Sequence, residues 1–391
     1  MSAQPYPHDL PAPDDAPDFS RIRRVLVTKL RYHGDVLLTS PVFTVLKANY
    51  PHLEIDALVY RETAPMLAFH PGVDTVHCVD KREVRDGPVG RLRAELALHR
   101  RLRAREYDLL IHLTEHWRGP VLKRLLGIPL AVTANYRRRS SRFWRTSFTH
   151  FYPVPTAPRH KAESHLDALR RLGVHPRTAD QKRLVLGIDA AAIESLQSKL
   201  AARGAAAAGH VVIHPTSRFA YKAWTTQGMA ELIDRLHAAG ERVVITCAPN
   251  LDECDSVERI VAACRFAPVS LAGALSLNEL AECIRAAKLF IGVDSAPMHM
   301  ASAVGVPVVS LFGPTNQGVW GPWLVPHRIV SSGASCQPCQ LRGCGDGLRS
   351  DCMTDLQPDD VWRAATGLLE SAPCVLPFPS SRSSVEPIRH R

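Results

Sequence analysis

The chain of 391 residues lacks the features of a membrane-spanning or secreted protein. No stretch approaches the roughly 18 uncharged apolar residues that a spanning helix needs. The N-terminal stretch MSAQPYPHDLPAPDDAPDFS has neither the basic n-region nor the apolar h-region of a signal peptide. We therefore expect a protein of a reducing compartment, in which the ten cysteines form no disulfide framework. Residues 1–20 are expected to be a disordered lead-in and residues 373–391 a flexible tail.

Common nucleotide-binding signatures are missing as well. No loop of the second half has the dinucleotide pattern G-x-G-x-x-G or the P-loop pattern G-x-x-x-x-G-K-[ST], which weakens a dehydrogenase and argues strongly against a P-loop ATPase. The chain also contains no Asp-x-Asp, the usual pairing that holds a divalent ion against the diphosphate of a nucleotide sugar. A diphosphate would instead be stabilised by hydrogen-bond donors and helix termini.

The formal charge of +10 is placed unevenly along the chain. Residues 21–180 carry 29 lysines and arginines against 15 aspartates and glutamates, whereas residues 181–391 carry 19 of each. This asymmetry suggests that the first half meets an anionic partner, either nucleic acid or a phosphate-bearing membrane surface. A basic surface that only keeps the protein in solution would not explain why the excess stops at the middle of the chain.

Short apolar strands alternate with helical stretches in both halves, which predicts parallel sheets covered on both faces. The predicted strands are RVLVTKL, EIDALVY, TVHCVD, YDLLIHL and LAVTAN in the first half, and VVIHPT, RVVITCAP, VSLAG, LFIGVD and PVVSLFG in the second. The length favours two domains. We expect an α/β protein with two Rossmann-like, doubly wound domains, residues 21–175 and 176–372, facing each other across a ligand-binding cleft.

A Gly-Asp pair, Gly34–Asp35, follows the first predicted strand and precedes an apolar helix in KLRYHGDVLLTSPVF. Such a pair at a strand-to-helix turn either closes a phosphate-binding loop, aims one carboxylate at a reaction, or caps the helix. Pro41 lies inside the helical stretch and predicts a kink or an offset start. The residues alone leave the three roles of the pair open.

Two loops of the second half carry polar residues where strands end. In HPTSRFAYKAW, Thr216 and Ser217 offer hydroxyls and Lys222 follows, a combination that suits a diphosphate leaving group. In FIGVDSAPMHM, Asp294 and Ser295 lie at a predicted helix N-terminus, where free N–H groups and the helix dipole favour an anion. The plain alternatives are a solvated loop lysine and an N-cap aspartate.

Three ordered stretches together resemble the bacterial lipopolysaccharide core heptosyltransferase family, glycosyltransferase family 9: LRYHGDVLLTSPVFTVLKANYP, IHPTSRFAYKAWTTQGMAELI and FIGVDSAPMHMASAVGVPVVSLFGPT. The first resembles the heptosyltransferase III branch most closely. The resemblance covers roughly residues 22–370 and implies a GT-B fold. It further implies inverting transfer of L-glycero-D-manno-heptose from ADP-heptose to the lipopolysaccharide inner core, as heptose III onto heptose II. This work would occur in the cytoplasm at the inner membrane, without a cofactor for catalysis.

The resemblance also implies roles for matching residues. Asp35 would be the catalytic base that takes the proton of the acceptor hydroxyl. Thr216, Ser217 and Lys222 would bind the diphosphate. The other expected donor contacts are Asp294, Ser295, Ala296, Met298 and His299, and the expected acceptor contacts are Arg31, His33, Gly34 and Arg61.

The stretch NYRRRSSRFWR, residues 135–145, places five arginines beside Phe143 and Trp144. Arginines that contact phosphates and aromatic rings at the headgroup level suit docking onto an anionic membrane surface that presents the lipid A–core acceptor. Nucleic-acid binding would use the same residue types. Because no nucleic-acid module signature occurs, we expect no nucleic-acid partner.

Four cysteines, Cys336, Cys339, Cys344 and Cys352, lie within one short segment. Their spacing could wrap a tetrahedral Zn²⁺, which would be structural because four thiolates leave no open position for catalysis. An iron–sulfur cluster, redox-active thiols and free thiols remain open.

Two other functions would use parts of the same pattern. A nucleotide-sugar epimerase on the GT-B plan would need acid and base groups but no acceptor site, which leaves the basic half unexplained. A basic nucleic-acid-binding protein with a zinc ribbon at residues 336–352 would leave the GVDSAPMH turn without a role.

Overall fold

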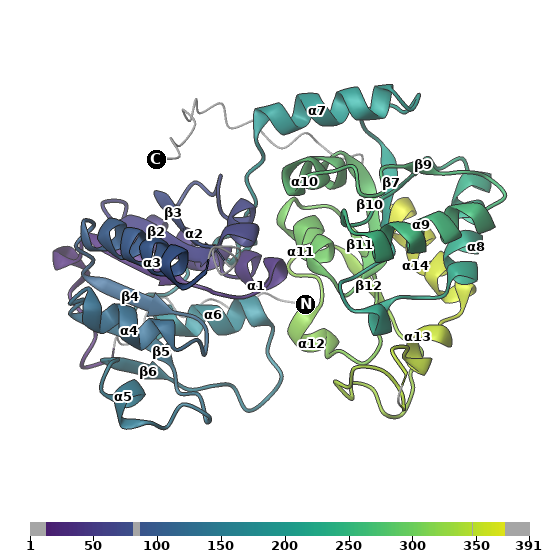
Figure 1. Cartoon of the computed structure of the whole chain (residues 1–391). Helices are drawn as coiled ribbons and strands as arrows, with labels where there is room; N and C mark the ends of the chain where they lie inside the picture. The colour runs from purple at the N-terminus through teal and green to yellow at the C-terminus, as the bar shows by residue number, and fades with distance from the viewer. Residues whose placement is uncertain (1–12, 81–86, 346, 372–391) are drawn as a thin grey trace. The chain divides into compact units, whose positions relative to one another are not determined.

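The computed structural model of the chain describes residues 13–80, 87–345 and 347–371 (Figure 1). Their contacts divide them into two compact units. Unit 1 contains the residues up to Asp189 together with Gly318–Trp323, and unit 2 contains Ala190–Gln317 and the residues from Leu324 onward. The division falls later in the chain than the boundary expected between residues 175 and 176.

Unit 1 is built on a six-stranded parallel sheet in the order β3-β2-β1-β4-β5-β6. The strands are β1 (Arg24–Thr28), β2 (Glu54–Tyr60), β3 (Thr75–Val79), β4 (Leu109–His112), β5 (Leu130–Ala134) and β6 (His150–Tyr152). The central strands are buried along almost their whole length, as expected when helices cover both faces of a parallel sheet. The sequence predicted β1 to β5 but not β6, which has three residues and precedes a proline-rich stretch.

The helices of unit 1 connect these strands in sequence order. They are α1 (His33–Leu37), α2 (Ser40–Asn49), α3 (Gly87–Arg103), α4 (Arg118–Leu125), α5 (Arg142–Arg145) and α6 (Lys161–Arg170), with the 3-10 turns η1 (Phe19–Arg21), η2 (Arg61–Met66) and η4 (Asp180–Lys182). The predicted offset at Pro41 is present, because α1 ends at Leu37 and Pro41 lies in the first turn of α2. Asp35 therefore lies in a short helix of its own at the end of β1.

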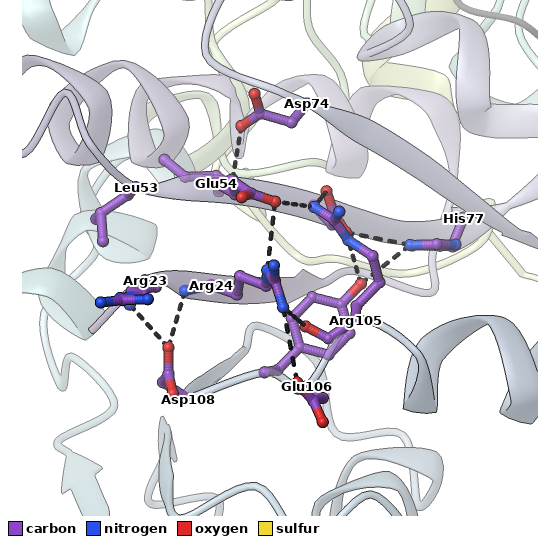
Figure 2. Close-up of polar contacts among 12 residues, drawn as sticks. Arg23, Arg24, Leu53, Glu54, Asp74, His77, Arg105, Glu106 and Asp108 are labelled. Carbon is purple, nitrogen blue, oxygen red and sulfur yellow. Dashed lines mark hydrogen bonds and ion pairs between the residues drawn. The ribbon is translucent and has the colours of Figure 1, made fainter. Parts of the chain in front are cut away.

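The amino-terminal ends of the central strands of unit 1 are joined by a polar network. The carboxylate of Asp56, buried on β2, accepts hydrogen bonds from Arg105 Nε at 2.8 Å and from the Tyr107 hydroxyl at 2.6 Å, and lies 3.3 Å from His77 Nε2. Burial by itself would raise the pKa of Asp56, but these hydrogen bonds bring that pKa below its ordinary value. Figure 2 shows the outer contacts, which involve Arg23, Arg24, Glu54, Glu106 and Asp108.

Unit 2 repeats the same strand order, with the sheet β12-β11-β10-β7-β8-β9. The strands are β7 (His210–His214), β8 (Val243–Ile245), β9 (Val269–Ser270), β10 (Ala287–Val293), β11 (Val308–Leu311) and β12 (His327–Val330). The first and fourth strands of the unit, β7 and β10, are neighbours, as β1 and β4 are in unit 1. The sequence predicted all of these strands except the short edge strand β12.

The helices of unit 2 enclose an apolar core that includes the buried faces of α8, α9 and α14. The elements are α7 (Ala190–Ala201), η5 (Ala220–Lys222), α8 (Thr226–Ala238), α9 (Leu251–Ala263), α10 (Leu277–Arg285), α11 (Ala296–Ala303), α13 (Asp351–Thr354) and α14 (Pro358–Ser371); α12 (Gln317–Trp320) lies where the chain passes between the units. In the described residues, no helix combines the length and apolar character that crossing a bilayer requires.

Candidate functional site

A cavity of about 530 Å³ lies in unit 1, where β1 and β4 end. Its lining residues come from the segments after β1, β4 and β5, from α6 and from the returning segment 318–323; they include Lys29, Arg31, Asp35, Glu115, His116, Tyr136, Arg139, Lys161 and Trp320. Four of these side chains are cationic and two are carboxylates. The cavity therefore offers a net positive surface to a polar, anionic ligand.

Asp35 lies in the first turn of α1, beside a buried lysine. The ammonium nitrogen of Lys29 is 3.7 Å from Asp35 Oδ1 and donates a hydrogen bond to the Leu113 carbonyl at 3.0 Å. Only 4% of Lys29 is exposed. This burial lowers the pKa of Lys29 to about 7, although the negative charge of Asp35 opposes the shift. The sequence analysis did not single out Lys29.

The expected acceptor residues fall into two groups. Arg31 lines the cavity with Asp35, and Gly34 belongs to α1. His33 Nε2 lies 2.8 Å from the Glu62 carbonyl, and Arg61 donates to Asp80 at 2.6 Å instead of lining the cavity.

Two further cations line the cavity: Lys161, which the sequence did not single out, and Arg139, one of the arginines of the basic stretch 135–145. Burial lowers the pKa of Lys161, which begins α6. Arg139 has a buried Nε for which the described part of the chain provides no hydrogen-bond partner. Both side chains carry N–H groups that could donate hydrogen bonds to an anionic group in the cavity.

In unit 2, the two predicted donor loops meet. Lys222, at the end of η5, donates to Asp294 Oδ2 at 2.6 Å, and the side chains are only 16% and 8% exposed. The two residues lie far apart in sequence, but their loops follow β7 and β10, which are adjacent parallel strands. Gly292 permits a close approach between these strands, since a Cβ there would lie 2.9 Å from the His214 carbonyl oxygen. The Lys222 ammonium keeps N–H donors for a further anion.

The start of α11 supplies more donors. Ser295 is the N-cap residue, yet its side chain makes no capping hydrogen bond, and its buried hydroxyl oxygen has no hydrogen-bond partner within the described residues. Ala296 is the first residue of the helix, so its backbone N–H belongs to the free donors of the first turn. A buried hydroxyl beside the positive end of a helix is a suitable environment for a phosphate oxygen.

The remaining donor candidates take part in contacts within the protein. Met298 is fully buried and its sulfur accepts a hydrogen bond from the Ser310 hydroxyl at 2.8 Å, while His299 is buried in the same helix. Both residues thus belong to the first turn of α11 but are buried.

Thr216 and Ser217 use their hydroxyls to shape the loop after β7. Thr216 donates to Glu253 Oε2 at 2.6 Å, which joins this loop to the start of α9, where Asn250 is the N-cap. The Ser217 hydroxyl oxygen accepts from the Phe219 N–H at 3.0 Å. These bonds fix the backbone that carries Lys222.

The basic stretch at residues 135–145 contains α5. Phe143 is exposed and its ring lies under the guanidinium of Arg124. Trp144, in contrast, is buried and packs against His112 and Phe148. The expectation that Trp144 contacts a membrane surface is therefore wrong, because its ring is part of the core of unit 1.

The four clustered cysteines belong to the segment 336–352 of unit 2. Burial raises the pKa of Cys352 to about 11, and the thiols of Cys344, Cys336 and Cys339 add to this shift. Within the described residues, however, no three His, Cys, Asp or Glu side chains are arranged to hold a metal ion.

Comparisons with known proteins bear on both units. Residues 95–347 match the family described as glycosyltransferase family 9 (heptosyltransferase). The chain is 38% identical over 295 residues to lipopolysaccharide heptosyltransferase 3 of Escherichia coli, a match that covers 75% of this chain and 84% of that protein.

Solved structures share the fold. The glycosyl transferase family 9 protein from Veillonella parvula matches with a TM-score of 0.77 and 23% identity, over 90% of this chain and 98% of that one. E. coli heptosyltransferase WaaC with ADP matches with a TM-score of 0.69 and 19% identity, over 88% and 99%. These likenesses confirm the predicted α/β architecture of the GT-B type.

Proposed function

The chain belongs to glycosyltransferase family 9, the heptosyltransferases, and from this premise we propose that it transfers L-glycero-D-manno-heptose from ADP-heptose to heptose II of the lipopolysaccharide inner core. The chain is thus a glycosyltransferase. We choose heptose II as the acceptor because the chain is similar to heptosyltransferase 3. An ADP-linked donor is supported by the solved complex of WaaC with ADP-2-deoxy-2-fluoro heptose, a protein of the same fold.

We propose that Asp35 is the general base of a single in-line displacement. Its carboxylate takes the proton of the acceptor hydroxyl as that oxygen bonds to the anomeric carbon, while the bond from this carbon to the phosphate oxygen breaks and ADP leaves. One displacement inverts the configuration at the anomeric carbon. The location of Asp35 in a cavity that is large enough for sugars and rich in donors supports this role.

We propose that unit 2 holds the ADP-heptose. The Lys222 ammonium, the Ser295 hydroxyl and the N–H of Ala296 would bind the diphosphate and stabilise the charge that develops on the leaving group. Asp294, which Lys222 holds in place, would accept hydrogen bonds from heptose hydroxyls. Thr216, Ser217, Met298 and His299 would shape the loops that carry these groups. The transfer requires no cofactor in this scheme.

The acceptor would occupy the cavity of unit 1. Arg31, Arg139 and Lys161 would bind the anionic groups of the lipid A–core, whereas His33, Gly34 and Arg61 would act at the edge of this site. An acceptor with phosphates explains why the excess of positive charge is confined to the first half of the chain.

We further propose that unit 1 docks on the anionic cytoplasmic face of the inner membrane. Val89, Leu92 and Leu96 recur at helical spacing on α3 and are exposed. Leu96 also lines a groove of about 360 Å³ together with Trp117 and with Leu125, the last residue of α4. The same two helices carry exposed arginines, Arg91, Arg93, Arg100, Arg101 and Arg103 on α3 and Arg124 on α4. Exposed apolar side chains among cations suit the headgroup region of an anionic bilayer.

Vesicle sedimentation tests the docking surface. Vesicles that contain phosphatidylglycerol should retain the protein, and the double variant Leu92→Glu/Leu96→Glu should reduce the bound fraction about tenfold, because two carboxylates then face the anionic surface. Leu348→Glu, at a residue that is 73% exposed in unit 2, is the matched control. Equal binding of the double variant, or equal binding to purely zwitterionic vesicles, would reject this surface.

The cysteine cluster carries a separate proposal, a structural zinc bound by Cys336, Cys339, Cys344 and Cys352. The spacing of the four cysteines within one short segment supports it. Elemental analysis of the purified protein should find about one zinc per chain, and Cys339→Ser should remove it while Cys264→Ser should not. A metal-free protein with full activity and unchanged thermal stability would reject the zinc.

The function itself is tested by incubating the protein with ADP-heptose and lipid A–core acceptors truncated after heptose I or heptose II. Mass spectrometry should detect the addition of one heptose to the acceptor that ends in heptose II. Conversion of the donor sugar without any acceptor would favour an epimerase. Thermal stabilisation by DNA but by neither ADP nor UDP would favour the nucleic-acid-binding alternative.

A further inference from the structure

The ammonium group of Lys29 is surrounded by three acceptors inside unit 1. It donates to the Leu113 carbonyl at 3.0 Å, contacts His165 Nε2 at 3.1 Å and lies 3.7 Å from Asp35 Oδ1. An ammonium has three N–H donors, and leaving one of them unsatisfied in the interior is costly. Of the three acceptors, only Asp35 is charged, and it is also the most distant.

The tautomer of His165 explains how the lysine is held. His165 Nδ1 lies 3.0 Å from the Leu38 carbonyl, which can only accept a hydrogen bond, so Nδ1 carries the proton. The lone pair of Nε2 then faces Lys29. Burial, followed by the positive charges of Lys29 and Lys161, lowers the pKa of His165 well below its ordinary value. His165 is therefore a neutral, fixed acceptor.

The charge of Lys29 depends on its surroundings. The ionisable groups that face it come from every element packed around it: Arg31 and Asp35 from the β1–α1 segment, His112 from β4, and Lys161 and His165 from α6. Asp35 is the carboxylate among them that favours the charged lysine, whereas burial and the neighbouring cations oppose it.

We propose that Lys29 is a positioning residue that orients the Asp35 carboxylate, and that His165 holds Lys29 in place for this purpose. This inference rests on the proposed role of Asp35 as the base. Lys29 faces Oδ1 and leaves Oδ2 to accept the proton of the acceptor hydroxyl. Lys29 retains its own proton during the transfer, so the step involves only the acceptor proton, the new glycosidic bond and the departing ADP.

A pH profile of kcat separates this role from a purely structural one. The charged lysine is present at low pH and is lost as the pH rises through its pKa, so the wild-type rate should fall on the alkaline side. Lys29→Met should lower kcat about 10- to 100-fold, leave the KM for ADP-heptose unchanged and remove the alkaline limb. Lys47→Met is the matched control, because Lys47 also donates to a backbone carbonyl, that of Leu53, and faces an aspartate, Asp74.

Substitutions of His165 keep the proposal testable if Lys29→Met fails to fold. His165→Leu removes one acceptor from the ammonium and should move the alkaline limb to lower pH. His165→Gln, whose side-chain carbonyl can accept the same hydrogen bond, should move it back toward the wild-type position.

The outcomes distinguish this inference from the proposed function. If Asp35→Asn retains transfer, Asp35 is not the base and the role of Lys29 falls with it. An inactive Asp35→Asn would support Asp35 as the base. If folded Lys29→Met then keeps the wild-type kcat and the alkaline limb, the positioning role of Lys29 is rejected while the role of Asp35 is retained. A wild-type alkaline limb in His165→Leu would likewise remove His165 from the account.

Discussion

Each unit places a lysine next to an aspartate at the carboxyl end of its sheet, but the two pairs are built differently. In unit 1, Lys29 and Asp35 come from one strand-to-helix segment and lie 3.7 Å apart, and the lysine has two other acceptors. In unit 2, Lys222 and Asp294 come from loops after two adjacent strands and lie 2.6 Å apart.

Because of this difference, the group that stays available for a ligand or a proton is the carboxylate in unit 1 and the ammonium in unit 2. In unit 1 the lysine donors are used inside the protein, so the carboxylate of Asp35 keeps an oxygen that can take a proton. In unit 2 the aspartate is engaged, so the ammonium of Lys222 keeps donors that can bind phosphate. In the proposed scheme, the same strand order would carry a base in one unit and an anion site in the other, because the loops differ.

The largest effect is expected at Asp35. Asp35→Asn preserves the shape of the side chain but removes the base, so the rate of heptose transfer should fall about 10³-fold. Mass spectrometry of the product over time measures this rate. Asp180→Asn, at an exposed aspartate of the same unit, should leave it unchanged. Substantial transfer by Asp35→Asn would show that the first pair does not supply the base.

A smaller effect is expected at Lys222. Lys222→Met removes a charged donor to the diphosphate, and the KM for ADP-heptose should rise about 10- to 100-fold. The loss of kcat should be smaller than for Asp35→Asn. Lys199→Met, which breaks the pair of Lys199 with Glu279 at 2.5 Å in the same unit, tests whether any lost ion pair has this result. Equal KM values for both lysine variants would contradict the assignment.

The smallest effect on activity is expected at the opposite end of the first sheet. Asp56→Asn leaves Arg105 without its buried carboxylate, and the free energy of unfolding should fall by about 3 kcal/mol while turnover per folded molecule is retained. Urea unfolding measures this difference, and the transfer assay provides the activity.

The pH dependence of that stability has a defined sign. The folded-state pKa of Asp56 lies below its unfolded value of about 3.9, so its stabilisation is present above about pH 4 and is lost as the pH falls through the folded-state pKa. The difference in the free energy of unfolding between wild type and Asp56→Asn should therefore become smaller below pH 4. A gap that stays constant down to pH 3 would show that the ionised carboxylate does not contribute.

Much of the fold could be predicted because the inner strands are continuous apolar runs bounded by turns. The two strands that sequence reasoning missed, β6 and β12, are the short edge strands that follow β5 and β11. Edge strands have fewer buried positions, and β6 adjoins several prolines, so the apolar signal is weak there. The sequence predicted Lys222 and Asp294 as donor contacts but not their ion pair, which results from the topology, since both loops come after strands that lie side by side.

The partners of Asp35 could not be predicted in the same way. His165 contacts Lys29 from a helix 136 positions later in the chain, and Trp320 reaches the same cavity from the second half of the sequence. One local signal was available for Lys29. A lysine that directly follows a buried strand has its backbone in the interior, so its side chain can be buried as well. Trp144 was predicted to be at the surface because its neighbours in the sequence are arginines, but its ring is buried in the core.

The central claim is that unit 1 supplies the base and unit 2 supplies the ADP site. Titration calorimetry of ADP into Asp35→Asn and Lys222→Met, side by side, tests it most directly. Asp35→Asn should bind ADP with wild-type affinity, and Lys222→Met should bind ADP at least about tenfold more weakly. Weak binding by Asp35→Asn together with unchanged binding by Lys222→Met would contradict it.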